Sequence, residues 1–306
     1  MNVLILGGHG FIGSHIVELL SNTGHSLRVL ARKKSEIKYK GELILGDFFD
    51  DTKLSEALVG IDTVVHCIST TVPKSSEMDP IYDIKSNLIG IVRLLQLMKA
   101  HNVPNLIFLS SGGTVYGNSS SSPITEDSAL NPVSSYGAVK VAMEKFIGLS
   151  ELNWGVKSII IRPSNPYGER QGFKGLQGLI SVVLKSTFDE SPVLIYGDGS
   201  MLRDYVYVQD VAKLICRAID SNRSGIYNAG SGVGHSVNQI ISTIEKVSGK
   251  KVQRLYQEAR SFDVKNVVLS SELTQRHFGW KSTTTLESGI RKQYEWLKGR
   301  NDSANR

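Results

Sequence analysis

Apolar positions along the first half of the chain follow two alternating patterns. Longer segments near 12–22, 53–59, 83–101 and 136–152 repeat apolar residues every three or four positions, as one face of a helix does. Runs that are apolar throughout are typical of strands buried on both faces, and the alternation of such runs with helices predicts an α/β fold, a doubly wound parallel sheet. The predicted strands are residues 3–6, 27–30, 43–45, 63–66, 106–110 and 158–161.

The pattern becomes irregular after Arg162. Proline and glycine become frequent there, and only short elements follow as far as Trp296. The expected division is a sheet domain of residues 1–164 with 203–232 returning to it, a smaller C-terminal substrate-binding lobe of 165–202 and 233–298, and a flexible tail of 299–306.

Charge and cysteine content exclude several classes of protein. The 306 residues include 35 Lys and Arg against 29 Asp and Glu, a net charge of +6, but the cations are spread along the chain. A nucleic-acid-binding protein usually gathers them into one stripe, so we expect an enzyme for anionic substrates and no nucleic-acid partner. Two cysteines cannot build a disulfide framework or a structural zinc site, and we expect no metal. Because no window approaches the ~18 apolar residues that span a bilayer, and the N-terminus lacks the charged head of a signal peptide, we expect a cytoplasmic protein with no membrane partner.

A glycine-rich motif, Gly-Gly-His-Gly-Phe-Ile-Gly, stands directly after the first predicted strand and before the first predicted helix. Gly7 permits a tight turn, Gly10 lets backbone amides approach a pyrophosphate, and Gly13 lets the helix pack closely on the strand. Phe11 and Ile12 open the helix, whose N-terminus attracts such an anion. In this context the motif predicts a dinucleotide-binding domain with a Rossmann fold over residues 1–164.

The end of the second predicted strand distinguishes the two nicotinamide cofactors. An acidic residue there binds the ribose hydroxyls of NAD, whereas an arginine suits the additional phosphate of NADP. In this chain Arg32, Lys33 and Lys34 follow the strand, and the acid is missing. Arg32 offers a planar fork to a phosphate, and Lys33 adds a point charge. These cations favour NADP; the alternative is a solvated basic turn in an NAD enzyme, with Arg32 stacked on the adenine.

Asp47 and Phe48 follow the third predicted strand. A carboxylate at that edge of the sheet can accept a hydrogen bond from the adenine amino group, while Phe48 flanks the ring. Alternatively, Asp47 caps the helix that begins near Asp51.

Tyr136 and Lys140 are four residues apart in a predicted helix and therefore share one face. A cation close to the phenol stabilises the phenolate, so the pair can work as a general acid and base, and Lys140 can also bind a ribose hydroxyl. The preceding strand ends near Ser110, Ser111 and Thr114. A hydroxyl there can donate to a substrate oxygen whose charge changes during hydride transfer.

Together these motifs resemble those of the extended short-chain dehydrogenase/reductases, in the group of nucleotide-sugar epimerases, dehydratases and reductases. The resemblance covers nearly the whole chain. Further matching segments are residues 66–69 (His-Cys-Ile-Ser), 87–90 (Asn-Leu-Ile-Gly), 162–168 (Arg-Pro-Ser-Asn-Pro-Tyr-Gly), 197–199, 203–212, 227–232 and 278–280.

The resemblance implies roles for the residues nearest the cofactor. Tyr136 is expected to be the catalytic acid/base, with Lys140 as its electrostatic partner and ribose ligand. Asn87 resembles a residue that lies near the cofactor and supports the active-site network. Helix capping is the alternative role for Asn87.

The resemblance also implies a binding site for the diphosphate of a nucleotide sugar. Asn165 resembles the asparagine that binds this diphosphate, and Arg203 and Arg260 resemble the arginines that clamp it, a role that suits guanidinium geometry. The alternatives are loop capping for Asn165 and an ordinary surface position for Arg260.

The segment after the fifth predicted strand departs from the family pattern. Sugar epimerases commonly carry Ser or Thr four residues before the tyrosine of a TVYG-like segment, but here that position is Gly112. The double glycine looks like a one-residue insertion, so alignment on the strand makes Ser111 the catalytic hydroxyl, with Ser110 and Thr114 as substitutes. The same glycines stand where a 4,6-dehydratase has an acid pair, which disfavours dehydration.

Within this family the sequence leaves two reactions open, and both use Tyr136 to move a hydroxyl proton during hydride transfer. A ketoreductase must exchange its cofactor and typically uses NADPH, whereas an epimerase retains NAD. The cations after the second strand therefore favour NADPH-dependent reduction of an NDP-4-keto-6-deoxyhexose, such as dTDP-4-dehydro-6-deoxyglucose, for surface polysaccharide (O-antigen) synthesis. The alternative is an NAD-dependent 4-epimerase of the UDP-glucose/UDP-galactose type. Many relatives form homodimers through helices like 83–101 and 136–152, which makes a homodimer a further expectation.

Overall fold

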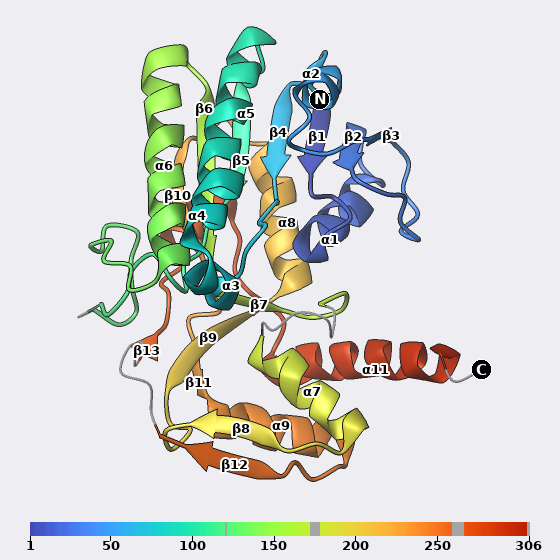
Figure 1. The fold of residues 1–306 in the computed structure, drawn as a ribbon, viewed down its shortest axis with the longest axis vertical. Coiled ribbons are helices and arrows are strands. Elements are labelled where there is room, and N and C mark those ends of the chain that lie inside the picture. The colour runs from blue at the N-terminus through green and yellow to red at the C-terminus, as the bar shows by residue number, and fades with distance from the viewer. Residues whose placement is uncertain (120, 172–177, 259–265, 305–306) are drawn as a thin grey trace.

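A seven-stranded parallel sheet forms the centre of the larger part of the molecule (Figure 1). The computed structural model describes residues 1–119, 121–171, 178–258 and 266–304. Within the sheet the order is β10-β6-β5-β4-β1-β2-β3, and each neighbouring pair is parallel. The strands are β1 (Asn2–Leu6), β2 (Ser26–Ala31), β3 (Glu42–Leu45), β4 (Thr63–His66), β5 (Asn105–Leu109), β6 (Lys157–Pro163) and β10 (Gly225–Ala229).

The apolar runs predicted as strands all lie in this sheet, with ends that differ from the prediction by two residues at most. Their continuous apolar character reflects burial on both faces: Val3, Leu4, Ile5 and Leu6 of β1 are fully buried. The predicted doubly wound parallel sheet is therefore confirmed.

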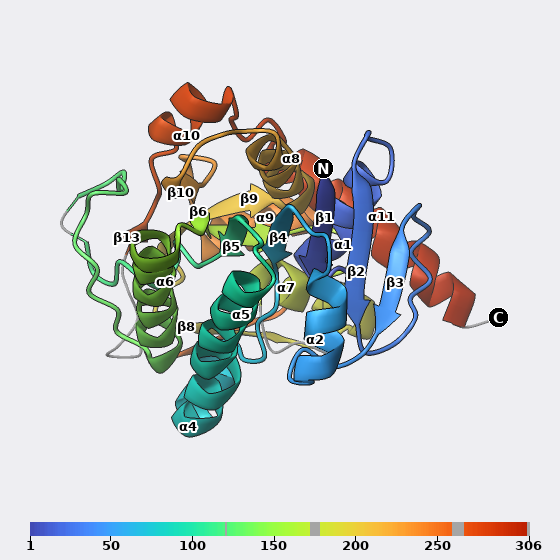
Figure 2. The ribbon, with the colours of Figure 1, turned by 90° about the horizontal axis from the view of Figure 1, so that it is seen from above.

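Helices cover both faces of the sheet (Figure 2). Each has an apolar side that faces the strands; in α8 the buried residues Val208, Val211, Ile215 and Ile219 recur at three- and four-residue spacing. One face is covered by α1 (Phe11–Leu20) and α8 (Val208–Ile219), the other by α2 (Asp51–Leu58), α5 (Ile89–Ala100) and α6 (Ser135–Trp154).

The helix predicted near 83–101 is divided into shorter pieces. Pro73 and Pro80 each open a short helix, where the missing proline N–H is tolerated. A π-helical turn then leads into α5, and such turns frequently mark functional sites. The pieces within the predicted range are η1 (Ile84–Leu88) and α5, and the short helices α3 (Pro73–Met78) and α4 (Pro80–Asp83) come before them.

A smaller lobe with its own apolar core lies below the sheet in Figure 1. Strand β9 (Leu202–Tyr207) pairs with β7 (Asn165–Tyr167), β11 (Gly234–Ser236) and β13 (Asn266–Val267). The other elements of the lobe are β8 (Val193–Tyr196), which pairs with β12 (Arg254–Gln257), and the helices α7 (Leu179–Asp189), α9 (Val237–Ser248) and α11 (Leu286–Ala304). Helix α10 (Glu272–Phe278) packs on the sheet domain instead.

Three details differ from the division expected from the sequence, and the first is that α10 and Trp280, expected in the lobe, pack on the sheet domain. Residues 203–232 supply α8 and β10 to the sheet domain, but they begin with β9, the central strand of the lobe's sheet. Helix α11 continues to Ala304, so the expected flexible tail is helical from Gly299 to that residue. The buried Leu297 anchors the helix, and Lys298 and Arg300 are residues that readily extend it.

Candidate active site

The glycine motif forms the predicted turn between β1 and α1. Gly7 has a φ of +81°, and its carbonyl accepts a hydrogen bond from the Gly10 N–H at 2.9 Å. A Cβ atom at Gly13 would lie 2.2 Å from the Gly7 carbonyl oxygen, so only glycine allows α1 to pack on the turn. The helix begins at Phe11, and Gly10 before it has no side chain that could accept hydrogen bonds from the first turn. This turn therefore offers the free N–H groups and the close backbone approach that a pyrophosphate needs.

A cavity of about 470 Å³ adjoins this turn. It is bounded by the ends of β2, β3 and β4, which places four of the predicted cofactor-binding residues on one cavity. These are Gly7, Gly10, Arg32 and Asp47.

Asp47 does not cap α2, so the alternative given for it is wrong. Its Oδ1 accepts from the Phe49 N–H at 3.0 Å, whereas the N-cap is Asp50, which accepts from Thr52 and Lys53. Asp47 instead lines the 470 Å³ cavity.

His9, which the sequence analysis did not assign, fastens the loop after β2 to the glycine turn. Its Nδ1 lies 3.0 Å from the Lys33 carbonyl and its Nε2 lies 3.2 Å from the Tyr39 hydroxyl. Because a carbonyl can only accept, Nδ1 donates to it, and Nε2 can accept from the Tyr39 hydroxyl. This arrangement holds the basic loop that begins with Arg32 at the rim of the cavity.

Tyr136 and Lys140 share one side of α6, as predicted. The Lys140 Nζ lies 5.7 Å from the centroid of the Tyr136 ring and donates to the Leu109 carbonyl at 3.1 Å. The side chain is 3% exposed, so this charge is shielded from water. A buried cation beside a phenol is an arrangement that can stabilise a phenolate.

The three candidate hydroxyls at the end of β5 have different surroundings. Ser110 is buried and donates to Glu144, while Ser111 is partly exposed. The Thr114 hydroxyl is buried and has no hydrogen-bond partner among the described residues. Gly112 has no room for a side chain, because a Cβ there would lie 2.9 Å from the Arg162 carbonyl oxygen. Ser110 therefore belongs to another hydrogen-bond network, and Ser111 and Thr114 are the two remaining candidates for the catalytic hydroxyl.

That network contains a buried ion pair that the sequence analysis missed. Arg162 Nη2 lies 2.5 Å from Glu144 Oε2, and both side chains are at most 3% exposed. Arg162 also donates to Tyr116 at 2.8 Å, and Tyr116 donates to Asn228 at 2.7 Å. Burial would lower the pKa of Arg162, but its bonds to Glu144 and Tyr116 outweigh burial and raise that pKa. The available signals were a glutamate one turn beyond Lys140 and an arginine ending an apolar strand.

Asn87 lies in the π-helical turn, where its amide group binds other protein groups. Its Nδ2 donates to Asp83 at 2.7 Å and to Thr70 at 2.8 Å, and its Oδ1 accepts from the Thr70 N–H at 3.1 Å. Asp83 is fully buried and accepts from Thr71 as well. Asn87 thus fixes the segment around Thr70, which lines the 470 Å³ cavity.

A second cavity, of about 270 Å³, lies in the lobe and brings Asn165 and Arg203 together with Tyr167, Tyr205 and Gln171. Asn165 Nδ2 donates to the Asp204 carbonyl at 2.8 Å, and Arg203 Nη1 donates to the Leu202 carbonyl at 2.9 Å. Arg260 lies outside the described residues.

The loop of residues 111–114 connects the Tyr136–Lys140 pair with the second cavity. A Cβ at Gly137, next to Tyr136, would lie 2.7 Å from the Thr114 carbonyl oxygen. On the other side, a Cβ at Gly113 would lie 3.6 Å from Asn165 Oδ1. The 111–114 loop thus links the tyrosine–lysine pair to a cavity that contains an arginine, and the 470 Å³ cavity lies beside the glycine turn. Within the described ranges, no three His, Cys, Asp or Glu side chains cluster as a metal site would require, and no described helix has the length and apolarity needed to cross a membrane.

Known proteins are similar to this chain in sequence and fold over nearly their full length. A family model described as "NAD dependent epimerase/dehydratase family" matches residues 3–230. The chain is 33% identical over 306 residues to a putative UDP-glucose 4-epimerase of Methanocaldococcus jannaschii (98% of this chain, 99% of the relative). It is 31% identical to a dTDP-4-dehydro-6-deoxyglucose reductase of Escherichia coli (95% of each). The crystal structure of a Thermus thermophilus UDP-glucose 4-epimerase in complex with NAD superposes with a TM-score of 0.90 at 32% identity, covering 98% of this chain and 99% of the other.

Proposed function

The chain belongs to the NAD dependent epimerase/dehydratase family, and from this premise we propose that it is a 4-epimerase of UDP-hexoses that retains NAD. Membership makes it an NAD(P)-dependent nucleotide-sugar epimerase or ketoreductase. The observation that carries the proposal is the connection of the Tyr136–Lys140 pair to the Asn165 cavity through the 111–114 loop. Epimerases of similar length and fold among the relatives support this reaction over the reduction that the sequence alone favoured.

The residues present fit a dinucleotide, because Gly10 at the start of α1 has no side chain to cap the helix and leaves the first N–H groups available to a pyrophosphate. When bound, NAD supplies a nicotinamide ring that accepts a hydride from carbon 4 of the sugar and returns it. Tyr136, as phenolate, takes the proton of the 4-hydroxyl and later gives it back. Lys140 stabilises the phenolate, and Ser111 donates to the same sugar oxygen.

The lobe holds the other end of the substrate in this proposal. Arg203 binds the diphosphate with its planar fork, and the Asn165 amide donates to the same group. Arg260 is proposed as a second arginine for the diphosphate. Because the lobe binds the diphosphate and leaves the sugar free to rotate, the oxidised sugar can present its opposite face for the return of the hydride.

The test is to purify the protein without added cofactor, denature it, and identify any released nucleotide by mass. We expect stoichiometric NAD, and conversion of UDP-galactose to UDP-glucose without added dinucleotide. A protein that is isolated empty and oxidises NADPH with dTDP-4-dehydro-6-deoxyglucose would refute the epimerase proposal.

One observation favours this reductase as a second candidate. Arg32 and Lys33 line the dinucleotide cavity, and the residues that end β2 include no acid for the ribose of NAD. A relative with that reductase activity is 31% identical to this chain. In this candidate NADP replaces NAD, and the product serves surface polysaccharide synthesis.

Replacing Arg32 with Asp measures the contribution of this cation. If the loop binds a 2′-phosphate, the R32D variant should bind NADPH at least about tenfold more weakly, a change of ~1.4 kcal/mol, because the carboxylate repels the phosphate. NADH binding should stay within about threefold in the same titrations. The matched control is Lys251→Asp, the same type of charge reversal on an exposed lysine of the lobe. If R32D discriminates between the two dinucleotides no differently from the wild type, Arg32 does not select the cofactor.

The homodimer remains a proposal, supported by exposed apolar side chains on neighbouring helices. Ile81 and Ile84 are 65% and 42% exposed, and on the adjacent α6 Leu149 and Leu152 are 49% and 82% exposed. Because exposed apolar side chains of this kind favour an interface, we expect light scattering to give twice the 33.6 kDa chain mass. Leu149→Glu should then give the monomer mass, whereas Leu255→Glu, on the exposed side of β12, should not. A wild-type monomer at micromolar concentration would contradict the proposal.

A further inference from the structure

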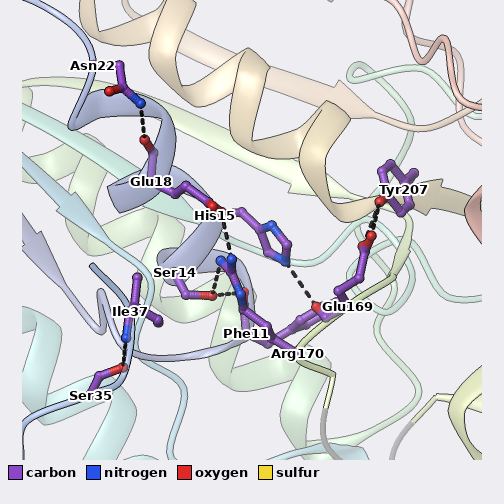
Figure 3. A network of polar contacts seen from close by, with 10 residues as sticks. All are labelled: Phe11, Ser14, His15, Glu18, Asn22, Ser35, Ile37, Glu169, Arg170 and Tyr207. Atoms are coloured by element: carbon purple, nitrogen blue, oxygen red, sulfur yellow. Dashed lines mark hydrogen bonds and ion pairs between the residues drawn. The ribbon is translucent and has the colours of Figure 1, made fainter. Parts of the chain in front are cut away.

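The turn of residues 168–171, directly after β7, lies between the 270 Å³ cavity and α1. Tyr167 before it and Gln171 at its end line the 270 Å³ cavity together with Asn165. Arg170 instead points toward α1, and the Glu169 side chain points toward Tyr207 of β9, as Figure 3 shows. The turn is therefore the place where the cavity wall of the lobe meets the helix of the dinucleotide domain.

Three contacts fasten the turn to α1. Arg170 Nη2 lies 2.7 Å from Glu18 Oε2, and its Nη1 donates to the Ser14 hydroxyl at 3.4 Å. His15 Nε2 lies 3.0 Å from the Glu169 carbonyl oxygen (Figure 3). Burial is the main cause that lowers the pKa of His15, so the ring is neutral and donates from Nε2.

The same turn is fastened to β9 on its other flank. The Tyr207 hydroxyl donates to the Glu169 carboxylate, with both oxygens within 2.7 Å. Burial, and then this bond, raise the pKa of Tyr207, so the phenol stays protonated and remains a donor. Because Arg203 and Tyr205 of β9 line the 270 Å³ cavity, Glu169 connects two walls of that cavity.

Arg170 adopts a backbone conformation that an arginine rarely takes. Its φ is +67°, in the left-handed region that favours glycine, and Gly168, two residues earlier, has a φ of +139°. A Cβ at Gly168 would lie 2.6 Å from Val208 Cγ1, so the chain passes β9 and α8 closely at this point. The strain at Arg170 is tolerated where its guanidinium group reaches Glu18 on α1.

We propose that Arg170 is a positioning residue for the nucleotide diphosphate: through its ion pair with Glu18 it holds the wall of the 270 Å³ cavity against α1. This inference rests on the proposed function, because it assumes that the cavity binds the diphosphate. Arg170 does not touch the reacting atoms, so its loss changes substrate affinity rather than the chemical step. Because the effect on affinity depends on the ion pair, replacing Glu18 should weaken substrate binding as replacing Arg170 does.

The test is calorimetric titration of UDP, used as the probe, into the protein as purified. Arg170→Met should raise the Kd for UDP about fivefold to tenfold, and Glu18→Gln should do the same, on the scale of coupled contacts. The double variant should bind no more weakly than either single variant, because both remove one interaction. Arg170→Lys keeps the charge and should bind within about twofold of the wild type. In the epimerase assay KM should rise while kcat stays unchanged.

The matched control is Arg254→Met. It removes an ion pair with Glu245 of 2.9 Å in the same lobe, with Arg254 31% exposed against 26% for Arg170. It should leave the Kd for UDP unchanged. Wild-type affinity in Arg170→Met, an equal loss in Arg254→Met, or strict additivity in the double variant would each overturn the positioning role while leaving the epimerase proposal intact. A wild-type protein that binds neither UDP nor dTDP would overturn the proposed function and this inference with it.

Discussion

Replacing Tyr136 with Phe is expected to lower kcat by roughly 10²- to 10⁴-fold, the usual contribution of a positioned acid/base. The variant keeps the ring beside Lys140 but loses the oxygen that exchanges the proton of the sugar 4-hydroxyl. Because Tyr136 makes no contact with the Asn165 cavity in this proposal, the Kd for UDP should stay within about twofold. Conversion of UDP-galactose to UDP-glucose, followed alongside UDP titration, separates the two effects.

Tyr256→Phe is the matched control, since it removes the same atom from a tyrosine 55% exposed on β12. Its activity should equal that of the wild type. If Tyr136→Phe keeps more than about a tenth of the activity, another group moves the proton. If UDP binding and thermal stability fall together with activity, the residue is structural.

Most of the sheet could be predicted because its strands are buried on both faces, and such burial leaves runs of apolar residues such as Val3 to Leu6. The glycine turn was predictable for a related reason: the steric requirement at Gly13 is local, since the clash would be with Gly7, six positions earlier. Tyr136 and Lys140 were found because helical spacing fixes their relation without knowledge of the rest of the fold.

Contacts between distant segments could not be predicted in this way. His15 meets the Glu169 carbonyl 154 positions later, and only the packing of the lobe against α1 brings them together. The choice of reaction was also beyond the sequence pattern. The charge of Arg32 favours NADP and therefore a reductase. Similarity over the whole chain instead favours a 4-epimerase, so a single residue and the overall similarity indicate different reactions.

The buried pair of Arg162 and Glu144 should have the largest effect on stability. Arg162→Met is expected to lower the free energy of unfolding by roughly 3–5 kcal/mol, because it leaves the Glu144 carboxylate buried without its cation. The variant also deprives Tyr116 of a partner. The measurement is urea unfolding at 25 °C, followed by circular dichroism, and compared at the transition midpoint.

A second variant separates the uncompensated charge from the loss of packing. In Arg162→Met with Glu144→Leu, both charges are gone, and replacing a buried pair by apolar residues is often neutral, so most of the stability should return. Lys185→Met, which breaks an exposed pair with Asp189 on α7, should change stability by less than about 1 kcal/mol. If the double variant is as unstable as Arg162→Met, the lost network of Ser110 and Tyr116 dominates, and the uncompensated charge is the wrong explanation. Glu144 accepts a hydrogen bond from Ser110, the residue before Ser111, and lies one turn beyond Lys140 on α6. If the double variant recovers stability but not activity, the ion pair also orients these catalytic groups.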